Sequence, residues 1–93
     1  MKILITGGAG FIGYNFCKYL LTKTNHKIYS IDNVNDYYSK KLKRARLKDL
    51  KKYKKFKFYH FDLCEKKKLN KVFKNNFNIV YHFAAQAGVR YSL

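Results

Sequence analysis

The stretch MKILITGGAGFIG, residues 1–13, decides the fold of this chain. An apolar run passes without a break into a turn that has glycine at positions 7, 10 and 13. This order is typical of a β-strand that runs into a nucleotide-binding turn. In such a turn Gly7 permits the sharp exit from the strand, Gly10 lets the backbone approach a pyrophosphate, and Gly13 lets the following helix pack closely on the sheet.

A helix is predicted directly after the turn, over residues 11–24. Its first amides, at Phe11 and Ile12, would face the phosphates of a nucleotide, whose negative charge the helix dipole favours. No Gly-Lys-Ser or Gly-Lys-Thr triplet follows the glycines, which excludes a P-loop. The helical period places four apolar side chains along one face of this helix, those of Ile12, Phe16, Tyr19 and Leu20.

Asp32 closes a second predicted strand, residues 27–32, and lies 19 residues after Gly13. This is the position of the acid that accepts hydrogen bonds from the adenosine ribose hydroxyls of a dinucleotide. A carboxylate there repels a 2′-phosphate, so we expect NAD to be preferred over NADP. The alternative is a structural turn followed by a surface acid. The basic residues that could soften the preference for NAD are Lys40, Lys41 and Lys43.

The rest of the chain repeats the alternation of strand and helix. Helices are predicted over residues 39–54 and 65–75, and strands over residues 55–61 and 78–83, the last apolar enough to be buried on both faces. The pattern predicts an α/β domain over residues 1–93. It is the first half of a Rossmann-type doubly wound parallel sheet, with right-handed crossovers and strand order 3-2-1-4.

In such a sheet the ligand lies over the carboxyl ends of the strands. Asp62 could accept a hydrogen bond from the adenine amino group, although capping of the following helix is nearly as good an explanation for it. Leu63 offers apolar surface to the adenine ring, and Ala84 and Ala85 let the backbone come close to the cofactor. The predicted cofactor-site residues are Gly7, Gly10, Phe11, Ile12, Gly13, Asp32, Asn33, Lys43, Asp62, Leu63, Phe83, Ala84, Ala85 and Gln86.

The charge of the chain invites a competing nucleic-acid interpretation, since 21 Lys and Arg residues oppose 5 acids, for a net charge of +16. The lysines gather in residues 39–57 and 65–74, where they interrupt apolar residues at helical spacing. We therefore favour two amphipathic helices whose lysines form solvated outer faces. The apolar stripes of these helices would be Leu42, Ala45, Leu50 and Tyr53 on the first, and Leu69, Val72 and Phe73 on the second.

Several other classes of protein have little support. No apolar run approaches the ~20 residues that span a bilayer, and no signal peptide is recognisable, so we expect a cytoplasmic protein. Cys17 and Cys64 have neither a CxxC pairing nor a Cys/His cluster, which argues against a zinc site or a disulfide. His60 and His82 are better explained as packed aromatic positions than as metal ligands.

These motifs resemble the NAD-binding half of the extended short-chain dehydrogenase/reductase family. The resemblance rests on residues 5–13, on Asp32 with Asn33, and on residues 82–85. Within the family, residues 32–38, the later 42–47 and residues 84–92 are similar to the UDP-glucuronate 4-epimerases, with the nucleotide-sugar dehydratases as the alternative. The resemblance implies tightly held NAD, a UDP-sugar substrate, transient oxidation at the sugar C4 and a homodimeric complete enzyme.

In that family a tyrosine is the base, activated by a lysine four residues later. The resemblance places this pair past residue 93, so the chain resembles an amino-terminal fragment without its catalytic motif. Abundant Tyr and Lys produce the same spacing by chance, at Tyr14/Lys18, Tyr19/Lys23, Tyr37/Lys41 and Tyr53/Lys57.

Arg90 and Ser92 are expected on the sugar-nucleotide side of the site. The segment after the fourth strand must leave the sheet where the nicotinamide and the sugar should meet. A guanidinium there can hold a carboxylate or phosphate in bidentate fashion. The alternative for Arg90 is a solvated position at the start of a helix.

Overall fold

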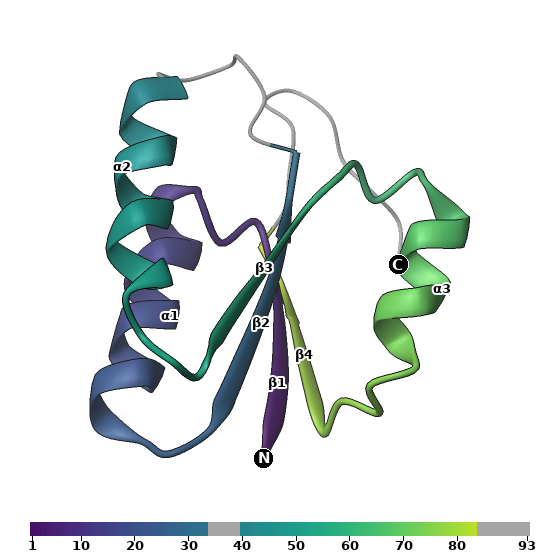
Figure 1. The fold of residues 1–93 in the computed structure, drawn as a ribbon, viewed down its shortest axis with the longest axis horizontal. Helices are drawn as coiled ribbons and strands as arrows, with labels where there is room; N and C mark the ends of the chain where they lie inside the picture. The colour runs from purple at the N-terminus through teal and green to yellow at the C-terminus, as the bar shows by residue number, and fades with distance from the viewer. Residues whose placement is uncertain (34–39, 84–93) are drawn as a thin grey trace.

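The computed structural model describes residues 1–33 and 40–83. Four parallel strands form one sheet in the order β3-β2-β1-β4, which confirms the predicted topology. Helices α1 and α2 cover one face of the sheet and α3 covers the other (Figure 1). The elements are β1 (Lys2–Thr6), α1 (Phe11–Lys23), β2 (Lys27–Asp32), α2 (Lys40–Lys51), β3 (Phe56–His60), α3 (Lys66–Phe73) and β4 (Ile79–His82).

The register of the strands brings their carboxyl ends to one edge of the sheet. Thr6, the last residue of β1, lies opposite Ile31 of β2 and His82 of β4. Asp32 in turn lies opposite His60 of β3. The carboxyl ends of all four strands therefore lie at the edge of the sheet where the sequence analysis placed the ligand.

The core forms one hydrophobic cluster on each face of the sheet, because successive side chains of a strand point to opposite sides. The face under α1 and α2 buries Ile3, Ile5 and Ile28 of the strands. The face under α3 buries Leu4 and Ile31, together with Phe61 and Val72. The helix residues buried against the first face are Cys17, Leu20, Leu21, Leu47 and Leu50.

The predicted inner face of α1 is half right, since Leu20 is buried and Phe16 packs against the core as predicted. Ile12 and Tyr19 are 64% and 58% exposed, whereas Gly13, Cys17, Leu20 and Leu21 are the buried residues of this helix. The helix passes so close to the glycine turn that small residues must face inward there. Hydrophobicity therefore placed Phe16 and Leu20 correctly and Ile12 and Tyr19 wrongly.

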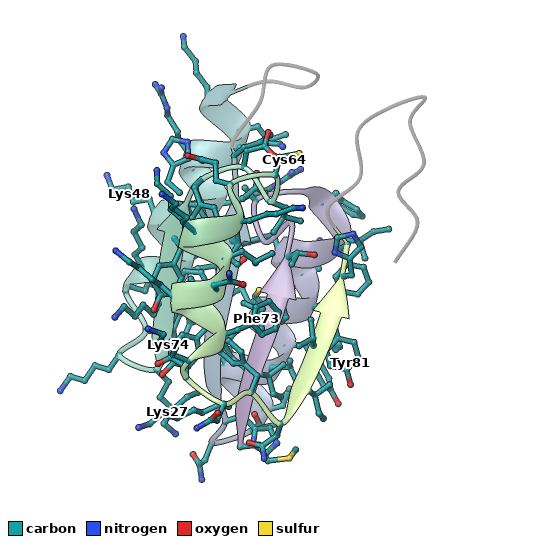
Figure 2. The ribbon with its side chains drawn as sticks, turned by 90° about the vertical axis from the view of Figure 1, so that its right-hand side faces the viewer. Lys27, Lys48, Cys64, Phe73, Lys74 and Tyr81 are labelled. Atoms are coloured by element: carbon teal, nitrogen blue, oxygen red, sulfur yellow. The ribbon has the colours of Figure 1, made fainter. Side chains whose placement is uncertain are left out.

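The predicted stripe of α2 is also wrong in its first half. Leu42 is 49% exposed and Ala45 is exposed, while Lys43, Leu47 and Leu50 are buried. In α3, Val72 is buried and Leu69 half-buried as predicted, but Phe73 is 43% exposed. The other described lysines of α2 and α3 are exposed, as the solvated-face interpretation predicted. Lys27, Lys48 and Lys74 lie on the side of the molecule away from Tyr81 of β4 (Figure 2).

Strand β4 is not buried on both faces, contrary to prediction. Val80 is 46% exposed, and Ile79 and Tyr81 are half-buried. Helix α3 packs through Val72 against Leu4, Ile31 and Phe61, over β1 and β2 rather than over β4. Figure 2 shows β4 to one side of α3, with no described element in front of it. A continuous apolar run therefore overstated the burial of this edge strand.

Candidate cofactor site

The glycine turn is anchored to the second strand by its backbone. The Gly7 amide donates to the Ile31 carbonyl at 2.8 Å, and the Gly7 carbonyl accepts from the Gly10 amide at 3.1 Å. Gly7 has φ of 78°, in the left-handed region where a Cβ is strongly disfavoured. The turn therefore leaves β1 sharply, as the sequence predicted for Gly7.

The other two glycines of the motif serve different purposes. A Cβ on Gly13 would lie 2.1 Å from the Gly7 carbonyl oxygen, so the close packing of α1 is against the turn itself. A Cβ on Gly10 would meet only that oxygen, at 3.4 Å, and its φ of −73° suits any residue. Nothing in the described fold excludes a side chain at Gly10, so close packing does not explain the glycine there.

Helix α1 begins without a side-chain cap. Gly10 is its N-cap, and no acidic residue lies in its first turn. The first amides of a helix have no partner within the helix, and they carry its positive dipole end. The side chains of Phe11 and Ile12 are 69% and 64% exposed, so only the backbone of these two predicted residues is positioned to meet a phosphate.

Asp32 is buried and faces the glycine turn. It is 6% exposed, and its Oδ2 accepts a hydrogen bond from the Ala9 amide at 2.9 Å. The Nζ of Lys43, a residue 8% exposed on α2, lies 3.8 Å from Asp32 Oδ1. The alternative of a surface acid is therefore wrong. Asp32 and Lys43 meet at the carboxyl end of β2, where the sequence placed the ribose.

Arg46 is a residue of this region that the sequence analysis did not assign to the site. Its Nη1 donates to the Ala9 carbonyl at 3.0 Å, and its guanidinium carbon lies 5.8 Å from the centre of the Phe11 ring. The spacing from Lys43 was an available signal, since residues three apart share a helix face. The sequence analysis also assigned no role to Gly8. In the structure a Cβ on Gly8 would meet Ser30 Oγ at 2.0 Å, so Gly8 packs closely against β2.

The residues predicted for the adenine side also lie together. Asn33 Nδ2 donates to Asp62 Oδ2 at 3.5 Å. Asp62 Oδ1 accepts from the Cys64 amide at 2.9 Å, and the hydrogen bonds from Cys64 lower the pKa of Asp62. The N-cap of α3 is Glu65, so Asp62 shapes the preceding turn and does not cap the helix. Leu63 is half-buried against the core under α3.

Phe83 continues the line of β4. Its amide donates to the Thr6 carbonyl at 3.0 Å, and its ring lies edge-on to Phe16, with centroids 5.6 Å apart. His82 is half-buried, with its Nδ1 2.7 Å from Thr6 Oγ1. His60 stacks on Phe58 but is exposed, so the predicted packed position is confirmed for His82 and not for His60. The remaining predicted residues, Ala84, Ala85, Gln86, Arg90 and Ser92, lie outside the described residues.

The Tyr14/Lys18 pair does not have the electrostatics of a catalytic base. The Tyr14 hydroxyl donates to Asp49 Oδ2 at 2.6 Å, and Lys18 Nζ lies 2.8 Å from the same oxygen. The hydrogen bond to Asp49 raises the pKa of Tyr14, whereas a base needs a lowered one. These residues tie α1 to α2.

Within residues 1–33 and 40–83 no group of three or more His, Cys, Asp or Glu side chains could hold a metal ion. In the same residues no helix is long and apolar enough to cross a bilayer.

The two cysteines should differ sharply in reactivity. Burial raises the pKa of Cys17 to about 12, while Cys64 is exposed beside Asp62. At about pH 8 an alkylating reagent should modify Cys64 in the folded chain and Cys17 only on unfolding, because the thiolate is the nucleophile. Since folding raises the pKa of Cys17, its contribution to stability should be present below about pH 8.5 and decline as the pH rises toward 12.

Intact-protein mass spectrometry would count the labels with and without denaturant. Cys64→Ser is the matched control and should take no label while folded. Rapid labelling of Cys17 in the folded Cys64→Ser variant would contradict the prediction.

A parallel sheet with a glycine turn, an uncapped helix start and a buried acid after the second strand defines a Rossmann-type dinucleotide-binding fold. The model of the family described as GDP-mannose 4,6 dehydratase matches residues 4–93, and the chain belongs to that family.

Relatives of the chain support the same assignment. "Protein CapI" of Staphylococcus aureus is 48% identical over 94 residues, which cover 100% of this chain and 28% of CapI. A UDP-glucuronate 4-epimerase of Thermodesulfobacterium geofontis is 44% identical over 91 residues, which cover 97% of this chain and 28% of that enzyme. The chain therefore spans little more than a quarter of the length of these relatives.

A solved structure shows the same fold. The UDP-glucuronic acid 4-epimerase of Bacillus cereus, in complex with UDP-glucuronic acid and NAD, superimposes with a TM-score of 0.85 and 36% identity. The match covers 97% of this chain and 28% of the Bacillus cereus chain.

Proposed function

We propose that this chain is the NAD-binding part of a nucleotide-sugar epimerase that acts on UDP-glucuronate. The observation that carries the proposal is the open position at Gly10, over the uncapped start of α1 and beside the buried Asp32. Backbone amides and a helix dipole suit a pyrophosphate, and a carboxylate suits ribose hydroxyls. The similarity to UDP-glucuronate 4-epimerases supports the choice of sugar.

The residues present fit NAD. The amides of Phe11 and Ile12, at the uncapped start of α1, would hold its pyrophosphate, and Asp32 would hold its adenosine ribose. Asp62 and Leu63 would meet the adenine. When bound, NAD supplies a hydride acceptor for transient oxidation of the sugar C4. We also propose that the complete enzyme is a homodimer in the cytoplasm and that its Tyr-Lys base is not among residues 1–93; the resemblance supports the homodimer and the place of the base.

NAD should bind the chain saturably and NADP more weakly, since Asp32 repels a 2′-phosphate. Gly10→Val should abolish NAD binding without unfolding the chain, because the side chain would occupy the approach of the pyrophosphate. Calorimetric titration with each cofactor would measure this, and circular dichroism would confirm folding. Tighter binding of NADP than of NAD would contradict the role of Asp32.

The same experiment separates a cofactor site from a nucleic-acid module. A basic module should bind an oligonucleotide with a steep salt dependence and should be indifferent to Gly10→Val. Binding of DNA or RNA with those properties, and no saturable binding of NAD, would refute the proposal.

A 4,6-dehydratase is the second candidate, favoured by the description of the matching family. The products of the complete enzyme would decide between them, since an epimerase product has the mass of its substrate and a dehydratase product has lost one water.

We also propose that Arg90 and Ser92 bind the sugar nucleotide. In the complete enzyme Arg90→Ala should then raise KM for the sugar nucleotide while NAD content stays unchanged.

A further inference from the structure

The peptide groups of Ala9, in the glycine turn, are held from both sides, by Asp32 of β2 and by Arg46 of α2. Ala9 is fully buried. Its amide donates to Asp32 Oδ2 at 2.9 Å, and Lys43 of α2 stands 3.8 Å from the other oxygen of that carboxylate. Its carbonyl accepts from Arg46 Nη1, also of α2, at 3.0 Å. Arg46 therefore contacts Ala9 directly, whereas Lys43, one turn earlier on α2, reaches it only through Asp32.

The hydrogen bond from Arg46 fixes the orientation of one peptide plane. The peptide between Ala9 and Gly10 is held at its oxygen by Arg46 and at its nitrogen by the Gly7 carbonyl, at 3.1 Å. If this plane rotated, the carbonyl dipole could turn toward the space in front of Gly10. A carbonyl oxygen repels a phosphate, so the turn can bind a pyrophosphate only while that oxygen is directed to another donor.

Arg46 is itself held in place. Its side chain is half-buried, and its guanidinium lies 5.8 Å from the centre of the Phe11 ring. Leu47 and Leu50, which follow Arg46 on α2, are buried in the core. Asp49 of α2 accepts a hydrogen bond from Tyr14 of α1 at 2.6 Å. The guanidinium therefore belongs to a helix that packs on the sheet through its leucines and is hydrogen-bonded to α1.

We propose that Arg46 is a positioning residue, which keeps the peptide between Ala9 and Gly10 in the orientation that admits a pyrophosphate. The inference rests on the proposed function, because it assumes that the glycine turn binds the pyrophosphate of NAD. It adds a requirement that the glycine motif does not contain. The phosphate-binding shape of the turn depends on a cation 36 residues after Gly10, on another helix.

The first test uses the chain without ligand. Arg46→Met should accelerate hydrogen exchange of the Gly10 amide about tenfold or more, because a hydrogen bond to a charged group that holds the turn has been removed. Arg44→Met is the matched control, since Arg44 is exposed on the same helix and its loss changes the net charge equally. It should leave this exchange rate unchanged.

The second test measures two ligands by NMR titration, ADP-ribose and adenosine. Arg46→Met should weaken ADP-ribose about tenfold and leave adenosine within about twofold, since only ADP-ribose has a pyrophosphate. Arg46→Lys retains a donor and should recover most of the affinity. If Arg46→Met does not fold, Arg46→Gln, whose amide can still donate, should show an intermediate loss for ADP-ribose alone.

Three results would overturn the positioning role. An unchanged exchange rate with weaker ADP-ribose binding would mean that Arg46 contacts the ligand directly. Equal losses for ADP-ribose and adenosine would mean a general structural role. No change in either test would mean that the hydrogen bond is dispensable. If the unmodified chain bound no NAD while Arg46→Met still accelerated exchange, the proposed function would fail. The conclusion that Arg46 stabilises the conformation of the glycine turn would remain valid.

Discussion

Gly13→Ala should destabilise the fold by about 3 kcal/mol or more, although helix propensity alone predicts a gain of about 1 kcal/mol. The added Cβ would lie 2.1 Å from the Gly7 carbonyl oxygen and 2.8 Å from its carbon. Both are backbone atoms of a turn that is hydrogen-bonded to β2, so neither can move without breaking that connection. The loss is a large part of the ~5–15 kcal/mol that stabilises a small domain.

Gly10→Ala is the control for this prediction. Its Cβ would meet only one atom, at 3.4 Å, and the cost should be about 1 kcal/mol or less, from the weaker N-cap. Urea unfolding of the two variants beside the unmodified chain would give both values. Equal stabilities for Gly13→Ala and Gly10→Ala would show that the close contact of α1 with the turn is not what requires glycine.

Asp32→Ala should destabilise the fold by about 3–5 kcal/mol, the usual cost of removing one partner from a buried ion pair. Asp32 and Lys43 are 6% and 8% exposed, so the change would leave the Lys43 ammonium buried without this counterion. It would also remove the acceptor of the Ala9 amide.

A double-mutant cycle separates these two contributions. Asp32→Asn keeps an oxygen for the Ala9 amide but removes the charge, and should lose less than Asp32→Ala. Adding Lys43→Met to Asp32→Asn should restore more than half of the stability that Asp32→Asn loses, since no unpaired charge then remains from this pair. Chemical denaturation would measure Asp32→Ala and the four members of the cycle, namely the unmodified chain, Asp32→Asn, Lys43→Met and the double variant. Strictly additive losses would show that Asp32 and Lys43 are not coupled.

The topology was predictable because each of its signals is local. Alternating strand and helix patterns, with right-handed crossovers, leave few arrangements for four parallel strands. Asp32 could be assigned from its distance along the chain to the glycine motif.

The ends of the helices were less predictable. Helix α3 ends at Phe73, two residues before the predicted end, and Asn76 then adopts a φ of 56°.

Burial was predicted less well, because periodicity tells which residues share a helix face but not which face meets the sheet. Ile12 and Leu42 are exposed, although both are strongly apolar, while Lys43 is buried. In each case the deciding factor is the neighbour. The glycine turn admits only small residues of α1, and the Asp32 carboxylate accommodates a lysine of α2. The glycine turn adjoins α1 in the sequence, but helical periodicity does not tell which side of the helix meets it, and Asp32 lies 11 residues before Lys43.

The sequence by itself determined the parallel sheet, the place of the glycine turn and the acid after the second strand, because each depends on residues close together in the chain. Only the tertiary structure decided that Ala9 is the residue on which Asp32 and Arg46 converge. It also decided that Gly13 is required for the packing of α1 against the turn itself, where the sequence had predicted packing on the sheet. These contacts join segments more than 20 residues apart or depend on gaps of a few tenths of an ångström, which no pattern along the chain specifies.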